Sequence, residues 1–347
     1  MDFGGGDQIR FERTGKAGIV TLTRPKALNA LTHRMVKALG AALTAWENDR
    51  GVEVVILKAE GRAFCAGGDI LEVYKAWQEG KRLTEFFADE YRLNAQIDRF
   101  KKPYVSLIDG ICMGGGMGIS AHGSHRVMTE NAVFAMPEVG LGFFPDVGGS
   151  YLLPNLGSSF GMYLGLTGNK IEYGDALWSG IATHTVQAAY LPAIAEEIAE
   201  SGDPGGELRE FFKAARRKTD EACLHAIAKH FSLGSLTDIV ASLDRAARTD
   251  QFAADTLATI RSRSPTSLHV TFRAITAGST MSMDECMKME FRILNRMLES
   301  HDLYEGIRAA LIEKGSVPNW QPARLEEVST VAVDAYFAPL PEGELQL

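Results

Sequence analysis

The chain has 347 residues, of which 46% are hydrophobic and 23% charged, which is ordinary globular composition with enough apolar residues for a full core. Its formal net charge of −8 argues against non-specific binding of nucleic acid through a basic surface. No apolar run approaches the roughly 20 residues that a membrane-spanning helix needs, and the N-terminal segment is too polar for a secretory signal. We therefore expect a cytoplasmic protein that binds neither nucleic acid nor a membrane.

The first half of the chain alternates strand and helix patterns. Residues 9–25 predict two short strands joined by a Lys-Ala-Gly turn, and the apolar spacing of residues 33–49 predicts a helix. Buried strands are predicted within residues 52–61 and 102–110, and a third strand with a short extension within residues 125–140. Strands separated by helices indicate βαβ units and a largely parallel sheet, so the predicted fold class is α/β.

The second half of the chain has a different character. Helical periodicity broken by Gly and Pro dominates after about residue 190, and we place a soft boundary at residues 190–205. This divides the chain into a first region, 1–200, and a helical region, 201–347. Residues 71–92 predict a mostly helical segment, and its many charged residues suggest that part of it is a mobile loop over a site.

Two glycine-rich turns follow predicted strands directly. They are GRAFCAGGDI, residues 61–70, and GICMGGGMGIS, residues 110–120. Small residues leave backbone N–H groups accessible at the start of a helix, where they can bind an anion or a polarised oxygen. Close packing of a helix on a sheet would explain either turn alone. Two turns from one sheet could instead present one N–H each to the same oxygen, as an oxyanion hole requires.

A dinucleotide site is an alternative interpretation of the second turn. The segment from Gly116 to Ala121 fits the pattern G-x-G-x-x-A, and a predicted strand precedes it. That interpretation leaves the first glycine-rich turn without a role. It also leaves two acids downstream unexplained, and we favour it less.

These two acids, Glu138 and Asp146, lie 146 − 138 = 8 positions apart in a stretch that is otherwise nearly all apolar or glycine. A poorly solvated carboxylate has a raised pKa, and a second acid nearby raises the pKa of one of the pair further. This is the condition for a base that works near neutral pH. The alternative is an ordinary acid at a strand end and an acid in a turn before Gly148.

The cysteines and histidines do not predict a metal site. Cys65, Cys112, Cys223 and Cys286 form no CxxC pair, so we expect reduced, mostly buried thiols. His122 and His125 have no third ligand nearby in the sequence, which favours a structural or surface role.

Several of these segments together resemble a known family. LTRPKALNALT, the two glycine-rich turns and MPEVGLGFFPDVGG are similar, in order and spacing, to the enoyl-CoA hydratase/isomerase (crotonase) superfamily. FFPDVGGSYLLP, SPTSLHVTFRAI, DECMKMEFRI and LYEGIRAALIEKGSVPNWQP resemble its 3-hydroxyisobutyryl-CoA hydrolase branch. The resemblance implies a crotonase-like ββα spiral core carrying the CoA and oxyanion sites. It also implies a C-terminal helical region that completes the acyl pocket.

The resemblance also implies site residues. Backbone amides of Ala66 and Gly115 correspond to the family's oxyanion donors. Contacts to the CoA part of the substrate are implied for Lys26, Leu28, Gly67, Gly68 and Asp69. Relatives often form trimers or hexamers, so a homo-oligomer is expected. No metal or bound cofactor is expected, because CoA arrives as part of the substrate.

One departure from the family pattern favours the hydrolase branch. The hydratases use two glutamates, and these correspond here to Glu138 and to Gly118, which has no side chain. The hydrolase branch shares this loss and uses an acid that corresponds to Asp146. It also has an acid before the next strand, which corresponds to Glu90.

The implied reaction is hydrolysis of a 3-hydroxyacyl-CoA thioester, as in valine breakdown. Glu138 activates water or attacks directly to give a mixed anhydride, and the sequence leaves both routes open. Asp146 orients the substrate hydroxyl or the water, or shares a proton with Glu138, and Glu90 binds the 3-hydroxyl. An enoyl-CoA hydratase or isomerase acting through Glu138 alone is the main alternative. A non-catalytic acyl-CoA binder is another.

Overall fold

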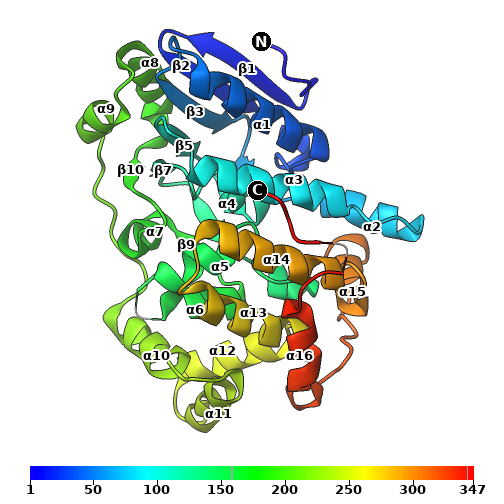
Figure 1. The fold of residues 1–347 in the computed structure, drawn as a ribbon. Helices are drawn as coiled ribbons and strands as arrows, with labels where there is room; N and C mark the ends of the chain where they lie inside the picture. Colours follow the sequence, from blue (N-terminus) through cyan, green and yellow to red (C-terminus); the bar gives the residue numbers. More distant parts are fainter. Residues whose placement is uncertain (158, 342) are drawn as a thin grey trace. The chain divides into compact units, whose positions relative to one another are not determined.

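The protein forms two compact units, each assembled from separate stretches of the chain (Figure 1). The computed structural model describes residues 1–157, 159–341 and 343–347. Unit 1 consists of Met1–Asp69, Glu85–Ala135 and Lys170–Lys218, and unit 2 of Ile70–Thr84, Met136–Asn169 and Thr219–Leu347. The predicted single boundary near residue 200 therefore does not describe this division, because residues 136–169 group with the C-terminal helices.

Unit 1 is built on a six-stranded sheet in which one antiparallel pair precedes a parallel set. The strand order is β1-β2-β3-β5-β7-β10, with bounds Ile9–Thr14, Ala17–Leu22, Val54–Ala59, Tyr104–Ile108, His125–Thr129 and His184–Val186. The turn between the first two strands was predicted at the Lys-Ala-Gly residues 16–18, and the structure places it earlier, at Gly15 and Lys16. Gly15 lies in the left-handed region with φ +53° and closes the turn with Lys16, so Ala17 begins β2.

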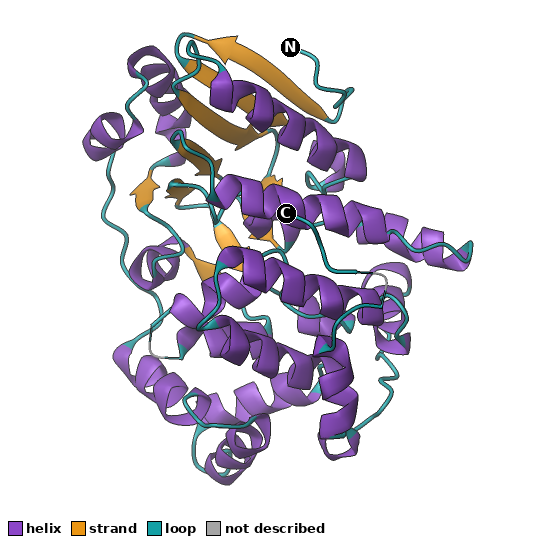
Figure 2. Ribbon diagram, in the orientation of Figure 1, coloured by secondary structure: helices purple, strands orange, loops and turns teal. Residues whose placement is uncertain are grey.

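Helices cover this sheet through their apolar sides. Helix α1, His33–Asn48, buries Met35, Leu39, Leu43 and Trp46, and the Thr32 side chain accepts a hydrogen bond from the amide of Met35 at its start. Helix α8, Leu191–Ser201, and the following α9, Pro204–Glu210, share a core cluster with strands of the sheet. Figure 2 shows these helices against the orange strands.

A second sheet in unit 1 positions the glycine-rich turns. Its order is β4-β6-β8-β9, with bounds Ala63–Cys65, Ile111–Met113, Val133–Ala135 and Ile171–Glu172. Strands β4 and β6 pair in parallel, so the two turns, which follow the carboxyl ends of these strands, lie on the same side of the sheet. The first turn leads to α2, Ile70–Gln78, and the second to a single helical turn, α4, Gly115–Gly118. The remaining helices of unit 1 are α3, Thr84–Asp98, and α7, Tyr173–Ser179.

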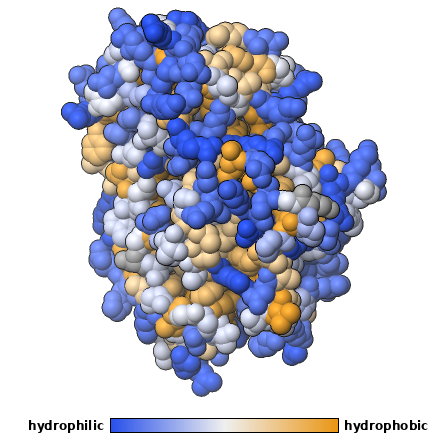
Figure 3. Space-filling view, viewed as in Figure 1, coloured by the Kyte–Doolittle hydropathy of each residue, from blue (hydrophilic) through white to orange (hydrophobic). Residues whose placement is uncertain are grey.

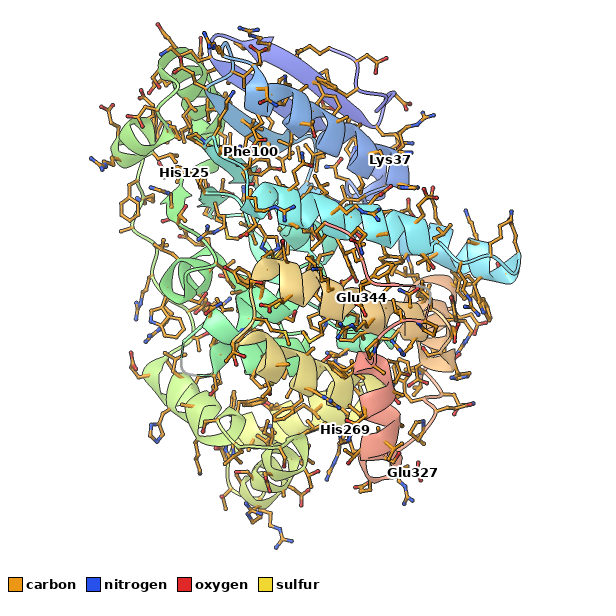
Figure 4. All side chains as sticks on the ribbon, in the orientation of Figure 1. Lys37, Phe100, His125, His269, Glu327 and Glu344 are labelled. Atoms are coloured by element: carbon orange, nitrogen blue, oxygen red, sulfur yellow. The ribbon has the colours of Figure 1, made fainter. Side chains whose placement is uncertain are left out.

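Unit 2 consists of helices and loops, and its described residues form no strand. Besides α2 its α-helices are α5 Gly149–Leu152, α6 Phe160–Thr167, α10 Glu221–Phe231, α11 Leu236–Ala246, α12 Gln251–Arg261, α13 Pro265–Gly278, α14 Met283–Met297, α15 His301–Ile307 and α16 Thr330–Phe337. A capping box at Ser282 and Glu285 starts α14. The side chain of Arg292 on α14 donates to both carboxylate oxygens of Glu344, at 3.0 and 2.8 Å, which ties down the C-terminal segment (Figure 4).

The surface shows a mixture of residue types typical of a globular protein. On the face shown in Figure 3, hydrophilic residues predominate and apolar residues occur between them. Among the described residues, no helix is both long and apolar enough to span a bilayer.

Candidate functional site

The predicted site residues fall in both units. In unit 1, residues 28–31 run beside the first glycine-rich turn. The amide of Leu31 donates to the carbonyl of Gly67 at 2.9 Å, and the amide of Asp69 donates to the carbonyl of Leu31 at 2.8 Å. Two segments that the sequence singled out separately are therefore joined by backbone hydrogen bonds.

Asn29 holds the first of these segments in its unusual conformation. It lies in the left-handed region at φ 55°, which Asn tolerates better than most residues. Its buried side chain accepts from the amide of Arg24 at 2.8 Å and donates to the carbonyls of Glu60 and Ala63, both at 2.8 Å. The side chain thus fixes the turn from the inside, and sequence reasoning gave it no role.

The assignment of Ala66 as an oxyanion donor is wrong. Its amide donates to the carbonyl of Leu28 at 3.0 Å, so it is not available to a ligand. Within the described residues the amide of Gly68, two positions later, donates no hydrogen bond. The same holds for the amide of Gly115, which is the first residue of α4 and has no partner inside the helix.

The amides of Gly68 and Gly115 lie close to each other and to the carboxyl group of Glu90. A Cβ atom added to Gly115 would lie 3.1 Å from the Gly68 nitrogen and 2.6 Å from Oε1 of Glu90. A Cβ atom added to Gly67 would lie 3.7 Å from the Gly115 nitrogen. The two glycine-rich turns therefore present a pair of N–H groups beside the carboxyl group of Glu90, itself buried on α3.

The residues predicted to contact CoA have different surroundings. Asp69 forms a half-buried ion pair with Arg24 at 3.0 Å, which fastens the end of the first turn to the segment before Lys26. Lys26 lies exposed in a short 3-10 helix, Pro25–Ala27, and Leu28 follows it in the left-handed region. A lysine so placed is suited to an anion at the surface.

In unit 2, Glu138 begins a 3-10 helix, Glu138–Leu141. The N-terminus of α13 holds this helix, because the amide of Ser264 donates to the carbonyl of Val139 at 3.3 Å. The neighbouring Arg263 donates to the carbonyl of Thr167 at 3.0 and 2.7 Å. The SPTSLHVTFRAI segment, a sequence marker of the hydrolase branch, thus supports the backbone that carries Glu138.

The carboxyl group of Glu138 has an unusual environment. It is buried, and its Oε2 atom has no hydrogen-bond partner among the described residues. Burial raises the pKa of Glu138 well above its usual value, and the charges of Asp146 and Glu290 add to the rise. This confirms the physical argument from the sequence, that an acid in so apolar a stretch has a raised pKa beside a second acid.

Sequence reasoning missed Glu290 on α14. It lies in DECMKMEFRI, a segment used only as a marker of the hydrolase branch. Its buried carboxyl group accepts hydrogen bonds from the residues that follow Asp146, and burial raises its pKa to about 8. The one available signal was an acid inside the apolar repeat of a helix, which is unusual unless the acid has partners.

The thiols match the sequence-based expectation. All four cysteines are free, with Cys65, Cys112 and Cys286 buried. Among the residues described, no three of the His, Cys, Asp and Glu side chains form a group that could hold a metal ion.

Comparisons with known proteins agree with the resemblance. Residues 17–337 match the family model described as enoyl-CoA hydratase/isomerase. The chain is 42% identical to a Danio rerio protein named 3-hydroxyisobutyryl-CoA hydrolase, mitochondrial, over 99% of this chain and 92% of that protein. It is 38% identical to the Homo sapiens protein of that name, over 98% and 91%.

Solved structures give the same fold with other names. A carnitinyl-CoA dehydratase from Mycobacterium thermoresistibile has a TM-score of 0.92 at 39% identity, covering 98% of this chain and 99% of that one. An enoyl-CoA hydratase from Rhodobacter sphaeroides 2.4.1 has a TM-score of 0.91 at 37% identity, covering 98% and 100%. The predicted α/β crotonase-like fold is thereby confirmed.

The prediction of a cytoplasmic protein is contradicted by these comparisons. The relatives from Danio rerio and Homo sapiens are both named as mitochondrial proteins. The polar N-terminal segment argued only against secretion, and composition does not separate the cytoplasm from the mitochondrial interior.

Proposed function

Because the chain belongs to the enoyl-CoA hydratase/isomerase family, we propose that it hydrolyses a short-chain 3-hydroxyacyl-CoA thioester to the free acid and CoA. The proposed substrate is 3-hydroxyisobutyryl-CoA. Relatives of that name cover nearly the whole chain at about 40% identity, which supports the proposal. The observation that carries it is the buried carboxyl group of Glu138, whose Oε2 atom has no partner among the described residues and whose pKa is raised.

The thioester carbonyl oxygen is assigned to the amides of Gly68 and Gly115. Attack at the carbonyl carbon moves negative charge onto this oxygen, and two fixed N–H donors stabilise that charge more than they stabilise the neutral carbonyl. Removal of one such donor typically costs about 10²–10³ in kcat. In this assignment Gly68 takes the role that the sequence gave to Ala66.

Glu138 is assigned the role of base or nucleophile. Its raised pKa makes the ionised carboxylate a stronger base than an exposed glutamate, so it can take a proton from water at neutral pH. Direct attack on the thioester would give a mixed anhydride that water then hydrolyses. Asp146 lies close enough to raise the pKa of Glu138 and is assigned to orient the attacking water or to share its proton.

Glu90 is assigned to the substrate's 3-hydroxyl group. Its carboxyl group lies beside the Gly115 backbone, so a hydroxyl two carbons from a carbonyl held at that amide is within its range. A carboxylate accepts a hydrogen bond from a hydroxyl, and this contact would favour a 3-hydroxyacyl chain over an unsubstituted one. CoA is part of the substrate, and an oligomeric assembly stays a prediction.

Hydration of an enoyl-CoA is the second candidate, since both solved relatives described above carry names for addition or removal of water. In the family's hydratases a second glutamate corresponds to position 118. Here that position is Gly118, the last residue of α4, and it provides no carboxylate. Hydration through Glu138 alone would therefore lack one proton-transfer partner.

A thiol-release assay across a small panel tests the proposal. The panel contains 3-hydroxyisobutyryl-CoA, the unsubstituted isobutyryl-CoA and crotonyl-CoA, and crotonyl-CoA is also followed by loss of its enoyl absorbance. The proposal predicts release of CoA from the first substrate, slower release from the second and no hydration of the third. Hydration of crotonyl-CoA without release of thiol from any substrate would favour the second candidate.

A further inference from the structure

The carboxyl group of Glu290 on α14 binds the turn that follows Asp146. Its Oε2 atom accepts from the amide of Gly148 at 2.9 Å. Its Oε1 atom accepts from the amide of Ser150 at 3.0 Å and from the hydroxyl of Ser150 at 2.5 Å. All three bonds are buried, and they join residues more than 100 positions apart in the chain. Three donors on two oxygens suit a carboxylate better than any neutral side chain.

The turn that Glu290 binds has a strained backbone. Val147 has φ +50°, a region that β-branched residues rarely occupy. Gly148 follows at φ +87°, and the amide of Gly149 donates to the carbonyl of Asp146 at 2.7 Å. Such a conformation persists only where the surroundings enforce it, and strained residues of this kind are found at active sites. The three hydrogen bonds from Gly148 and Ser150 to Glu290 hold the residues that directly follow Val147.

The electrostatic surroundings of Glu290 connect it to the two predicted catalytic acids. Burial is the main cause that raises its pKa, the hydrogen bonds from Gly148 and Ser150 oppose this, and the charge of Asp146 adds to the rise. Glu290 in turn adds to the rise in the pKa of Glu138. The third titratable neighbour is Cys286, one turn earlier on α14, whose thiol has its pKa raised to about 12, mainly by burial.

We propose that Glu290 is a positioning residue of this site, which holds the strained Val147–Ser150 turn and thereby fixes Asp146 beside Glu138. This inference rests on the proposed function for its catalytic consequence. It goes beyond that function because it assigns a positioning role to a third acid, which lies about 140 residues later in the sequence and does not act on the substrate. Glu290 acts through the backbone of the turn and through its charge.

The test compares Glu290→Gln with variants that keep part of the interaction. Glu290→Gln preserves shape but loses the charge and leaves an NH₂ group facing a backbone donor. Glu290→Asp keeps the charge on a shorter side chain, and Ser150→Ala removes one of the three donors. Asp284→Asn is the matched control, because it removes an acid from the first turn of the same helix, 290 − 284 = 6 residues away and toward another side.

Glu290→Gln is expected to lower kcat for thiol release about 10–100-fold, with KM little changed, because small displacements of catalytic groups have effects of this order. Above about pH 8, where Glu290 is ionised, the variant lacks one charge that raises the pKa of Glu138, so its pH profile differs from that of the unmodified protein there. Glu290→Asp recovers part of kcat, Ser150→Ala loses less, and Asp284→Asn behaves as the unmodified protein. A Glu290→Gln enzyme with unchanged kcat and pH profile would overturn the inference.

Two further outcomes are distinguishable. If Glu290→Gln does not fold, Glu290→Asp and Ser150→Ala carry the kinetic test, and normal kcat in both would count against the inference. If the unmodified protein releases no thiol from any substrate, the proposed function fails. The inference is then decided by crystal structures of Glu290→Gln and Ser150→Ala. A turn that keeps Val147 at its positive φ in both variants would refute it.

Discussion

Gly115→Ala is the substitution for which the structure gives the sharpest expectation. The added methyl group would lie 2.6 Å from Oε1 of Glu90, 3.1 Å from the Gly68 nitrogen and 3.3 Å from Cδ1 of Leu31. The first distance is shorter than real contacts allow, so the carboxyl group of Glu90 or the backbone of α4 must move. Overpacking of this kind costs about 1–3 kcal/mol of stability. Displacing one of two oxyanion donors costs a further ~2.7–4 kcal/mol in the transition state, or about 10²–10³ in kcat.

Urea unfolding and thiol release from 3-hydroxyisobutyryl-CoA measure the two effects. Gly40→Ala, within α1, is the control, because its Cβ would meet only Oε1 of Gln96 at 3.4 Å. Alanine there is expected to leave activity unchanged and to stabilise the helix by up to about 1 kcal/mol. A double variant, Glu90→Ala with Gly115→Ala, removes the clash, so its loss of stability is expected to be smaller than the sum of the two single losses. Additive losses, or a Gly115→Ala enzyme with normal kcat, would refute the reasoning.

Three further predictions follow from other residues. Glu138→Gln is expected to lower CoA release about 10²–10⁴-fold. Because the folded-state pKa of Glu138 is raised, the unmodified protein is expected to lose stability as the pH rises above the ordinary pKa of a glutamate. The variant loses less, and urea unfolding at several pH values measures the difference. Equal pH dependence in both proteins would contradict this. Asn29→Ala is expected to cost about 2–4 kcal/mol, because it removes three hydrogen bonds at a left-handed residue. Asn29→Gly, which tolerates that conformation, is expected to cost about 1 kcal/mol less, and equal costs would argue against backbone strain. Lys26→Ala is expected to raise KM for an acyl-CoA, and the increase should be largest at low salt because salt screens an exposed contact to phosphate. The control is Lys37→Ala, on the exposed side of α1 (Figure 4), which is expected to leave KM unchanged. The same change of KM in both variants would indicate a general effect of charge.

Local patterns predicted the elements of unit 1 well. The apolar spacing of residues 33–49 matches α1, and the β-branched run before Gly61 matches β3. The first segment has a helical apolar period and the second is a continuous apolar run, and burial in the structure follows both patterns. The division of the chain was not predictable in this way. Residues 136–169 follow a strand of unit 1 in sequence but group with helices that begin about 50 positions after the segment ends.

The site shows a similar contrast. The raised pKa of Glu138 followed from its apolar neighbours in sequence, because burial is its main cause. The availability of an amide did not follow from sequence, since the partner of Ala66 is Leu28, 66 − 28 = 38 residues earlier. Glu290 was missed for the same reason, because its hydrogen bonds reach back about 140 residues to Gly148 and Ser150. Roles set by long-range hydrogen bonds need the folded chain.

In the proposed reaction the amides of Gly68 and Gly115 bind the thioester oxygen on which negative charge develops. A crystal structure of Glu138→Gln with 3-hydroxyisobutyryl-CoA bound tests it most directly. We expect the carbonyl oxygen about 2.7–3.1 Å from both nitrogens, with the 3-hydroxyl at the carboxyl group of Glu90. A carbonyl oxygen bound elsewhere, with either amide facing a different group, would contradict it.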